Sequence, residues 1–248
     1  MEPNPSFWQF IMRISCIIPA FNEEKLIGAC LDSIIRNSRG RFCEIIVIDN
    51  ASHDRTSEIA QARRGVKVIR EERKGLSFAR ECGRAAANGD FIAYIDADSR
   101  MPEGWIDNLD LAFRQHREAV CISGPPTYFD VTFLQKLFLR ILWWTAAPLT
   151  YRLVGYMVYG AHFVVKKEAI DEIGGFDCNI EFFGEDTDFA RRLKATGEVI
   201  FCMRFRIVTS ARRFKAHGFL NTSLTYGFNY VWPVLFKRSF STTYADVR

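Results

Sequence analysis

FIAYIDADSR, residues 91–100, joins five apolar residues directly to two aspartates, Asp96 and Asp98. An apolar run of this length, without polar alternation, is typical of a strand buried on both faces of a sheet. Two carboxylates so close together repel each other unless a positive group lies beside them. The stretch therefore predicts a buried strand whose carboxyl end carries a charged site.

Similar short apolar runs occur three times before this stretch. They cover residues 14–18, 44–48 and 66–69, and amphipathic helical patterns fill the gaps between them. In the first gap, Asn22 is the expected N-cap of a helix. Strands that alternate with helices are typical of βαβ units and a parallel sheet. We therefore expect an α/β fold with a mostly parallel central sheet.

The alternation continues beyond the aspartates and is interrupted by one aromatic segment, residues 133–165. Basic residues and Pro148 break this segment into apolar runs that are shorter than the roughly 20 residues of a transmembrane helix. Two interpretations stay open: a core helix under the sheet, or an amphipathic segment on a membrane with its basic residues against lipid phosphates. Other helices are expected over residues 102–116, 168–173 and 187–196, and strands over residues 120–123 and 198–202.

Length and composition fit one large domain. The chain has 248 residues and a formal net charge of +4, which is too small and too dispersed to indicate nucleic-acid binding. Its seven cysteines are odd in number and lack C-x-x-C spacing, as expected of reduced thiols. Residues 1–16 lack a basic n-region and a long apolar h-region, so they do not resemble a secretory signal. We expect a cytoplasmic protein, with a place at the inner face of the cell membrane left open.

Polar and acidic residues follow each of the first four expected strands. In open parallel sheets the ligand crevice lies beyond the carboxyl ends of the strands, so these groups are expected on one rim. Neither a G-x-G-x-x-G motif nor a P-loop motif occurs, which removes the usual support for dinucleotide or P-loop binding. Two carboxylates at a strand end instead favour Mg²⁺ or Mn²⁺, which bind through few carboxylates and keep waters and substrate phosphates.

Four motifs in order resemble the family 2 glycosyltransferases, enzymes that transfer a sugar from a nucleotide diphosphate sugar. The resemblance extends over residues 14–202. It implies the GT-A fold, a Rossmann-like three-layer sandwich, and a catalytic domain over residues 1–218. The motifs are IIPAFNEE (17–24), IIVIDNASHDRT (45–56), DAD (96–98) and GGFDCNIEFFGEDTDFARRLKATG (174–197).

The resemblance also implies a donor site on the rim. Asp98 would bind a Mn²⁺ or Mg²⁺ ion that bridges the diphosphate, and Asp96 would bind the ribose or a metal-bound water. For Arg80, which falls within an expected helix, a solvated charge is the alternative interpretation. The other implied contacts are Pro19, Ala20, Phe21 and Glu23 for the base and ribose, Asp49 as acceptor of a hydrogen bond from the base, and Lys74 with Arg80 for the diphosphate or base.

The reaction itself is implied at the fourth motif. Asp186 would remove the proton from the acceptor hydroxyl, and Glu185 would place the acceptor. The transfer would be a single in-line displacement with inversion at the anomeric carbon. His217, which follows the basic run 212–215, would complete the metal site. His162 lies in an apolar strand pattern and is expected to be a hydrogen-bonded core histidine.

Two departures from the family pattern limit what carries over. The second motif reads DNAS where DDGS is frequent, so the role of the second acid does not transfer to Asn50. The Q-x-x-R-W motif of the processive synthases does not occur, which favours one transfer per acceptor. The tail, residues 219–248, is aromatic and basic, and it is expected to be a helical segment packed on the domain or on a membrane.

The sequence therefore predicts a metal-dependent, inverting glycosyltransferase. Its donor is expected to be a UDP- or GDP-sugar, and its acceptor a glycan, a lipid-linked molecule or a small molecule in glycan, cell-envelope or glycolipid synthesis. A nucleotidyltransferase and a catalytically silent nucleotide-binding or membrane-associated module stay open as alternatives. The first would ordinarily carry a glycine-rich basic loop after the first strand, which PAFNEE is not.

Overall fold

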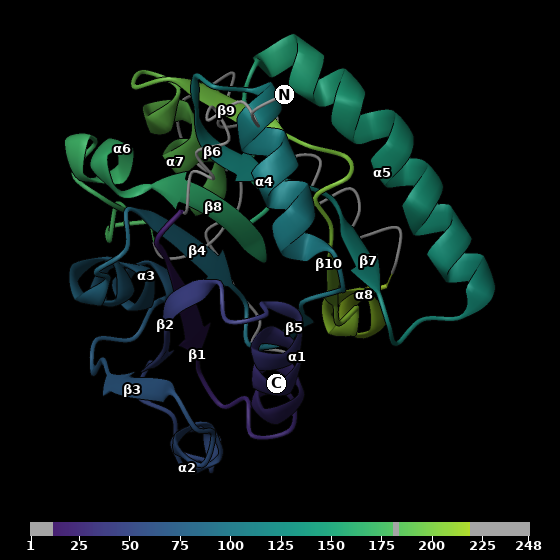
Figure 1. Ribbon diagram of the computed structural model, residues 1–248. Coiled ribbons are helices and arrows are strands. Elements are labelled where there is room, and N and C mark those ends of the chain that lie inside the picture. Colours follow the sequence, from purple (N-terminus) through teal and green to yellow (C-terminus); the bar gives the residue numbers. More distant parts are fainter. Residues whose placement is uncertain (1–11, 181–183, 219–248) are drawn as a thin grey trace, which may run out of the picture.

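The computed structural model describes residues 12–180 and 184–218 (Figure 1). The expected tail, residues 219–248, lies outside the described residues. Within the described ranges a seven-stranded sheet forms the centre of the molecule, in the strand order β3-β2-β1-β4-β8-β6-β9. The strands are β1 (Ile14–Ala20), β2 (Phe42–Asp49), β3 (Val66–Arg70), β4 (Phe91–Ile95), β6 (Ala119–Ser123), β8 (His162–Lys166) and β9 (Glu198–Phe201).

Parallel pairing dominates this sheet, as the alternation of strands and helices predicts. β1 pairs in parallel with β2 and β4, β2 with β3, and β6 with β9. In contrast, β8 runs antiparallel to its neighbours, β4 and β6. Its first residue, His162, therefore lies opposite Ile95, the last residue of β4. The reversed strand brings the residues before it to the rim where β4 ends.

Helices cover both faces of the sheet (Figure 1). Along β1, Cys16 and Ile18 belong to one apolar cluster and Ile17 to the other, as expected of side chains that alternate across a buried strand. The three-layer α/β sandwich is thereby confirmed. One face packs against α1 (Ile27–Asn37), α2 (Thr56–Gln61) and α4 (Trp105–Gln115), and the other against α3 (Leu76–Ala86), α6 (Lys167–Glu172) and α7 (Glu185–Leu193).

A second, smaller sheet, which the sequence pattern did not predict, borders the rim. Its strands are β5 (Ser99–Arg100), β7 (Pro126–Tyr128) and β10 (Ile207–Thr209), in the order β5-β10-β7. Strands of two or three residues are too short to show a period of two. The hydroxyl of Ser99 donates to that of Thr209 at 3.1 Å. This sheet leads the chain into α8 (Arg212–His217), beside the aspartates that follow β4.

The chain between β1 and α1 differs from the prediction. Asn22 is not an N-cap, because it has a φ of +52° and its side-chain oxygen accepts a hydrogen bond from the backbone N–H of His53 at 2.9 Å. α1 begins later, at Ile27, after a turn in which the carbonyl of Glu23 accepts from the N–H groups of Leu26 and Ile27. Asparagine tolerates the left-handed backbone better than most residues, so it suits this bend.

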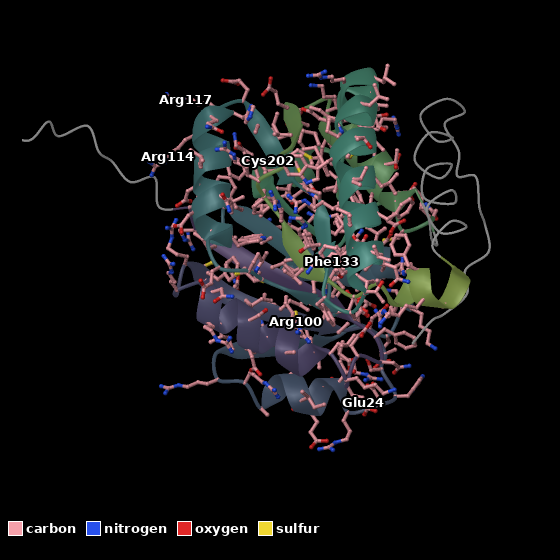
Figure 2. The ribbon with its side chains drawn as sticks, turned by 90° about the vertical axis from the view of Figure 1, so that its right-hand side faces the viewer. Glu24, Arg100, Arg114, Arg117, Phe133 and Cys202 are labelled. Carbon is pink, nitrogen blue, oxygen red and sulfur yellow. The ribbon has the colours of Figure 1, made fainter. Side chains whose placement is uncertain are left out.

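The first two thirds of the aromatic segment form one long helix, α5 (Phe133–Val154), on the outer side of the molecule (Figures 1 and 2), and its last four residues belong to β8. It begins with a capping box between Thr132 and Gln135 and ends at Gly155, whose φ is +80°. Only Leu139 and Ala147 of this helix are buried, so the interpretation as a core helix under the sheet is wrong. No helix in the described part of the chain is both long and apolar enough to cross a bilayer.

All seven cysteines lie within the described residues, and each is a free thiol. Burial raises the pKa of Cys16, Cys30 and Cys121. Because the thiolate is the reactive form, these three side chains behave as small apolar residues of the core. The cytoplasmic location stays a prediction.

Candidate active site

Asp96 directly follows β4, beside the end of β1. Its backbone N–H donates to the carbonyl of Ala161, and its carbonyl accepts from the N–H of Ser99, both at 2.9 Å. These bonds fix the turn by which the chain leaves the sheet. Burial and repulsion from Asp98 raise the pKa of Asp96 to about 7, while nearby arginines act in the opposite direction. Additional positive charge would therefore stabilise the carboxylate.

Asp98 lies beside an arginine from the other end of the described chain. Its carboxylate is 2.9 Å from the guanidinium of Arg212 and accepts a hydrogen bond from the hydroxyl of Thr209 at 3.3 Å. The same guanidinium donates to Glu23 at 2.5 and 3.0 Å. Although burial opposes its charge, Glu23 and Asp98 raise the pKa of Arg212. Arg212 thus connects Glu23, which was predicted to line the base and ribose pocket, with Asp98, which was predicted to bind the metal.

Arg212 was not among the site residues predicted from the sequence. It belongs to the basic run 212–215, which served there only to locate His217. The signal that could have indicated it is a basic pair that follows a strand after two residues, but that strand, β10, has only three residues. His217 is the last residue of α8, and its side chain lies outside what the structure describes. Its role as a metal ligand stays a prediction.

The two aspartates suit a hard divalent cation that shares its ligands with a substrate. Mg²⁺ and Mn²⁺ prefer carboxylate oxygens and keep waters and substrate phosphates. Among the described residues, no group of three or more His, Cys, Asp or Glu side chains is placed to hold a metal. The raised pKa of Asp96, caused by burial and by Asp98, indicates an excess of negative charge that a cation would relieve. The residues present therefore fit a metal bound jointly with a phosphate ligand.

Arg80 projects from α3 beneath the rim and is 1% exposed. Its Nη1 lies 3.0 Å from Oδ1 of Asp186, and its Nη2 donates to the carbonyl of Gly160 at 3.0 Å. Its guanidinium carbon lies 5.6 and 5.5 Å from the ring centres of Phe163 and Phe176. The interpretation as a solvated helix charge is therefore wrong. A contact with the diphosphate or base stays a prediction, but in this structure the guanidinium is committed to Asp186.

Glu185 and Asp186 lie in the first turn of α7, after Gly184, whose φ is +100°. Negative charge at this end of a helix is favoured by the helix dipole. A Cβ atom at Gly160 would overlap with the carboxylate of Asp186, so only glycine permits this close approach. Burial and repulsion from Asp186 raise the pKa of Glu185 to about 7, and Arg80 partly offsets them. Glu185 can therefore hold a proton near neutral pH.

One buried cation thus gathers acids from two distant parts of the chain. Burial opposes the charge of Arg80, but Asp186, Asp96 and Glu185 raise its pKa. The guanidinium of Arg80 therefore lies among three acids with different predicted roles. Asp96 was predicted to bind the ribose or a metal-bound water, Asp186 to act as the base, and Glu185 to place the acceptor. The guanidinium partly offsets the repulsion between these acids, although burial still raises the pKa of Asp96 and of Glu185 to about 7.

The residues predicted for the base and ribose lie on the β1–β2 side of the rim. Phe21 is half-buried, and the Nζ of Lys74 lies 5.1 Å from the centre of its ring. Pro19 and Ala20 are the buried last residues of β1. An aromatic wall with a cation beside it suits a planar ring that carries phosphates. The nucleotide contact itself stays a prediction.

Asp49, predicted to accept a hydrogen bond from the base, is engaged within the protein. Its side chain is 1% exposed. It accepts from the hydroxyl of Ser57 at 2.6 Å, the N–H of Ser52 at 3.0 Å and Nη1 of Arg70 at 2.9 Å. Burial opposes ionisation, but the bonds from Ser52 and Ser57 lower the pKa of Asp49. These bonds hold the loop between β2 and α2, and a contact with a base stays a prediction.

Asn50 shows what its departure from the family pattern does. Its Nδ2 donates to the carbonyls of Glu71 at 3.1 Å and Arg73 at 2.7 Å, and its Oδ1 accepts from the N–H of Gly75 at 2.9 Å. A carboxylate in this place could accept but not donate. The amide therefore fastens the loop after β3, which carries Lys74, against the rim.

Comparison with known proteins identifies relatives for this chain. The sequence model of glycosyl transferase family 2 matches residues 15–174, more than half of the 248 residues. The uncharacterized glycosyltransferase EpsJ of Bacillus subtilis is 35% identical over 103 residues, which are 40% of this chain and 30% of EpsJ. A dolichol-phosphate mannosyltransferase of Pyrococcus furiosus is 39% identical over 102 residues, 40% of this chain and 29% of that protein. Both matches span less than a third of the relative's length.

Among solved structures, the mannosyltransferase PcManGT from Pyrobaculum calidifontis, in complex with GDP-Man and Mn²⁺, has a TM-score of 0.62 to this chain. The likeness covers 85% of this chain and 62% of PcManGT at 19% sequence identity. At this identity the likeness shows the fold alone. The predicted GT-A fold is confirmed.

Proposed function

The chain belongs to glycosyl transferase family 2, and from this we propose that it is a metal-dependent, inverting enzyme that moves a sugar from a UDP- or GDP-sugar to an acceptor hydroxyl. The observation that carries the proposal is the ion pair between the buried Arg80 and Asp186, next to Asp96. It holds a candidate base close to carboxylates that suit a divalent cation, and such a cation can also bind a diphosphate. PcManGT, which shares the fold, was solved with GDP-Man and Mn²⁺.

The donor would lie across the rim from β1 to β4. Its base would stack near Phe21, and Lys74 beside that ring would meet negative charge on the donor. Arg212, which pairs with Asp98 and Glu23 in this structure, would bind the diphosphate. A guanidinium matches phosphate oxygens in a bidentate way. Recognition would therefore combine one apolar wall with cations from two separate segments.

Asp98 would hold the Mn²⁺ or Mg²⁺ ion, with Asp96 binding a metal-bound water or the ribose. The two aspartates follow β4 and are separated by Ala97, so they can take different tasks on the same rim. When bound, such an ion neutralises the charge that develops on the departing diphosphate. The chain's own contribution is to offer hard oxygen ligands on a rim where burial and Asp98 raise the pKa of Asp96.

Asp186 would act as the general base. It takes the proton of the acceptor hydroxyl while the acceptor oxygen forms a bond to the anomeric carbon and the bond from that carbon to the diphosphate oxygen breaks. The nucleoside diphosphate leaves with the bonding electron pair. Arg80 orients the Asp186 carboxylate through its 3.0 Å bond, and Glu185, one residue earlier, would hold the acceptor. Because the attack comes from the side opposite the leaving group, the anomeric configuration inverts.

Activity of the native protein and two variants tests the proposal. Release of UDP or GDP from labelled UDP- and GDP-sugars is measured with Mn²⁺ or Mg²⁺ for the native chain, Asp98→Ala and Asp186→Asn. We expect Asp186→Asn to lose about 10²–10⁴-fold in rate and Asp98→Ala to lose the metal-dependent thermal shift that UDP or GDP gives the native protein. Asp188→Asn is the matched control, because Asp188 lies on the same helix but pairs with Arg191 and Arg192 at 2.7 Å.

Equal activity in all four proteins would refute the site. Release of pyrophosphate from a nucleoside triphosphate and a sugar phosphate would indicate a nucleotidyltransferase instead. Binding of nucleotides without any turnover would indicate a silent binding module. The acceptor class, whether a glycan, a lipid-linked molecule or a small molecule, is then determined by offering each to the native enzyme and analysing the product.

A further inference from the structure

The outer side of α5 exposes large apolar side chains along most of its length. Phe133 is 79% exposed and Leu153, near the other end, is 78% exposed. Figure 2 shows Phe133 at one end of this helix, which lies along the side of the molecule. The α5 apolar face is defined here by six exposed residues, Phe133, Leu134, Leu137, Phe138, Ile141 and Trp144, and it is continued by Leu149 and Leu153.

This face is unusual because the opposite side of the helix is also apolar. Leu139 and Ala147 are buried against the body of the protein, as expected of the inner stripe of a surface helix. The outer side of such a helix is normally polar or charged. Large contiguous apolar patches on a protein surface mark binding sites. The α5 apolar face is therefore expected to be covered in use.

Charge identifies what covers it. Residues 133–154 include Lys136, Arg140 and Arg152 but no Asp or Glu. Lys136 and Arg140 are four residues apart, so they share one side of the helix. Arg140 and Arg206 lie 5.9 and 5.6 Å from the ring of Trp144, which places cations at the edge of the apolar face. Tryptophan and leucine beside basic residues suit the boundary between lipid head groups and acyl chains.

A second copy of the chain fits this face less well than a lipid surface does. In a two-fold dimer the same patch meets itself, and α5 has no acidic residue to pair with the basic residues of the other copy. Like charges held together at an interface oppose association. An anionic bilayer instead supplies phosphates opposite the cations and acyl chains opposite the leucines.

We propose that α5 lies on the surface of an anionic lipid bilayer, with the α5 apolar face in the interface and Lys136, Arg140 and Arg152 against lipid phosphates. The helix rests on the membrane and does not cross it, in keeping with the absence of a spanning helix among the described residues. The proposal concerns a different surface from the acidic rim and does not depend on the transfer reaction.

Vesicle flotation of the full chain tests the proposal. The protein is mixed with vesicles of phosphatidylcholine and phosphatidylglycerol, or of phosphatidylcholine alone, and the floating fraction is measured. We expect the native chain to bind the anionic vesicles, and the double variant Leu134→Glu with Ile141→Glu to lose at least about tenfold in partitioning. The matched control is Leu111→Glu, because Leu111 is an exposed leucine on another helix, α4. It should float like the native chain.

The charged part of the contact has its own test. Lys136→Gln with Arg140→Gln should reduce the preference for anionic vesicles by about tenfold or more, and added salt should reduce native binding in the same way. Thermal melts in solution should agree between all variants, since the changed side chains are exposed. Failure of the native chain to float, or equal flotation of the Leu134 and Ile141 double variant, overturns the proposal. If the native chain does not float but forms a dimer, and if the double variant is a monomer, the α5 apolar face binds a second copy of the chain.

Discussion

The acidic rim and the α5 apolar face differ in how their side chains are compensated. At the rim, charges from distant segments pair with one another, Arg80 with Asp186 and Arg212 with both Glu23 and Asp98. On the α5 apolar face, large side chains are exposed. A substitution at the rim should therefore also affect the ion-pair partners of the replaced residue. A substitution on the α5 apolar face should leave the stability of the protein unchanged until another molecule covers that face.

The strongest way to break the rim is to remove its buried cation. Arg80→Met leaves Asp186, Asp96 and Glu185 close together without the guanidinium that opposes their repulsion. Removing one partner of a buried ion pair typically costs about 3–5 kcal/mol, and we expect a loss of this size in urea unfolding at pH 7. Arg84→Met is the control, because Arg84 lies on the same helix but pairs with Glu81 and Asp171 nearer the surface.

The pH dependence of this loss is also defined. Burial and Asp98 already raise the pKa of Asp96 to about 7, and removal of Arg80 should raise it further. A carboxyl group whose pKa is higher in the folded state binds more protons there, so the native state gains relative to the unfolded state as the pH falls. The deficit of Arg80→Met should therefore shrink between pH 7 and 5. A deficit that grows over this range would contradict the assigned charges.

A second probe of the interior next to the rim is His162. Burial lowers the pKa of His162 to about 3, whereas an unfolded histidine titrates near about 6.5. Between these values the unfolded chain binds a proton that the native chain does not, so stability should fall as the pH falls below about 6.5, by roughly 2 kcal/mol at pH 5. His162→Phe should remove this part of the slope of unfolding free energy against pH, while His53→Gln, at an exposed histidine, should leave it unchanged.

A smaller loss of stability is expected from a change at Asn50, whose amide group holds the loop after β3 by hydrogen bonds. Asn50→Asp loses two donated bonds and turns a carboxylate towards the carbonyls of Glu71 and Arg73. Unsatisfied buried polar groups cost about 1–3 kcal/mol, and we expect a loss in this range by thermal or urea unfolding. Asn108→Asp, near the start of α4, should be close to neutral because acids are favoured in the first turns of a helix. Equal losses of unfolding free energy in both variants would show that the hydrogen bonds of the Asn50 amide do not stabilise the protein.

The smallest effect should come from the outer face of α5. Leu134 is 75% exposed, so Leu134→Gln should change the free energy of unfolding of the lipid-free protein by no more than about 0.5 kcal/mol. Leu139, on the inner side of the same helix, is 1% exposed, and Leu139→Ala should cost about 2–5 kcal/mol. Urea unfolding of both variants sharpens the comparison. A large loss at Leu134 would mean that the outer face is already covered within the chain.

Much of the fold could be predicted from the sequence. The strands of the central sheet are continuous apolar runs because helices cover both faces of that sheet. Such runs can be recognised in the sequence without any knowledge of tertiary contacts. Asn22 was misassigned as an N-cap because its side chain bonds across the rim to His53, which no local pattern records. The three-stranded sheet was missed for a related reason, since its strands are held by pairings between residues 99–100, 126–128 and 207–209.

The acids of the candidate site stand in motifs that the sequence shows, whereas Arg212 and the buried surroundings of Arg80 could not be predicted. Asp96, Asp98 and the pair of Glu185 and Asp186 follow recognisable motifs at the ends or starts of elements. The positions of Arg80 and Arg212 depend on contacts with residues more than a hundred positions away, so nothing near them in the sequence distinguishes them from surface arginines. Burial, which decides the role of Arg80, appears only once α3 and α7 are packed on the same face of the sheet.

The reversed direction of β8 has a mechanical consequence. Residues 155–161 are all that separates the end of α5 from β8, and within them the carbonyl of Gly160 receives the bond from Arg80. If α5 lies on lipid as proposed, this short connection would limit the distance between the membrane and the proposed active site. The proposed enzyme would then select acceptors by the distance of their hydroxyl groups from the membrane as well as by their chemistry.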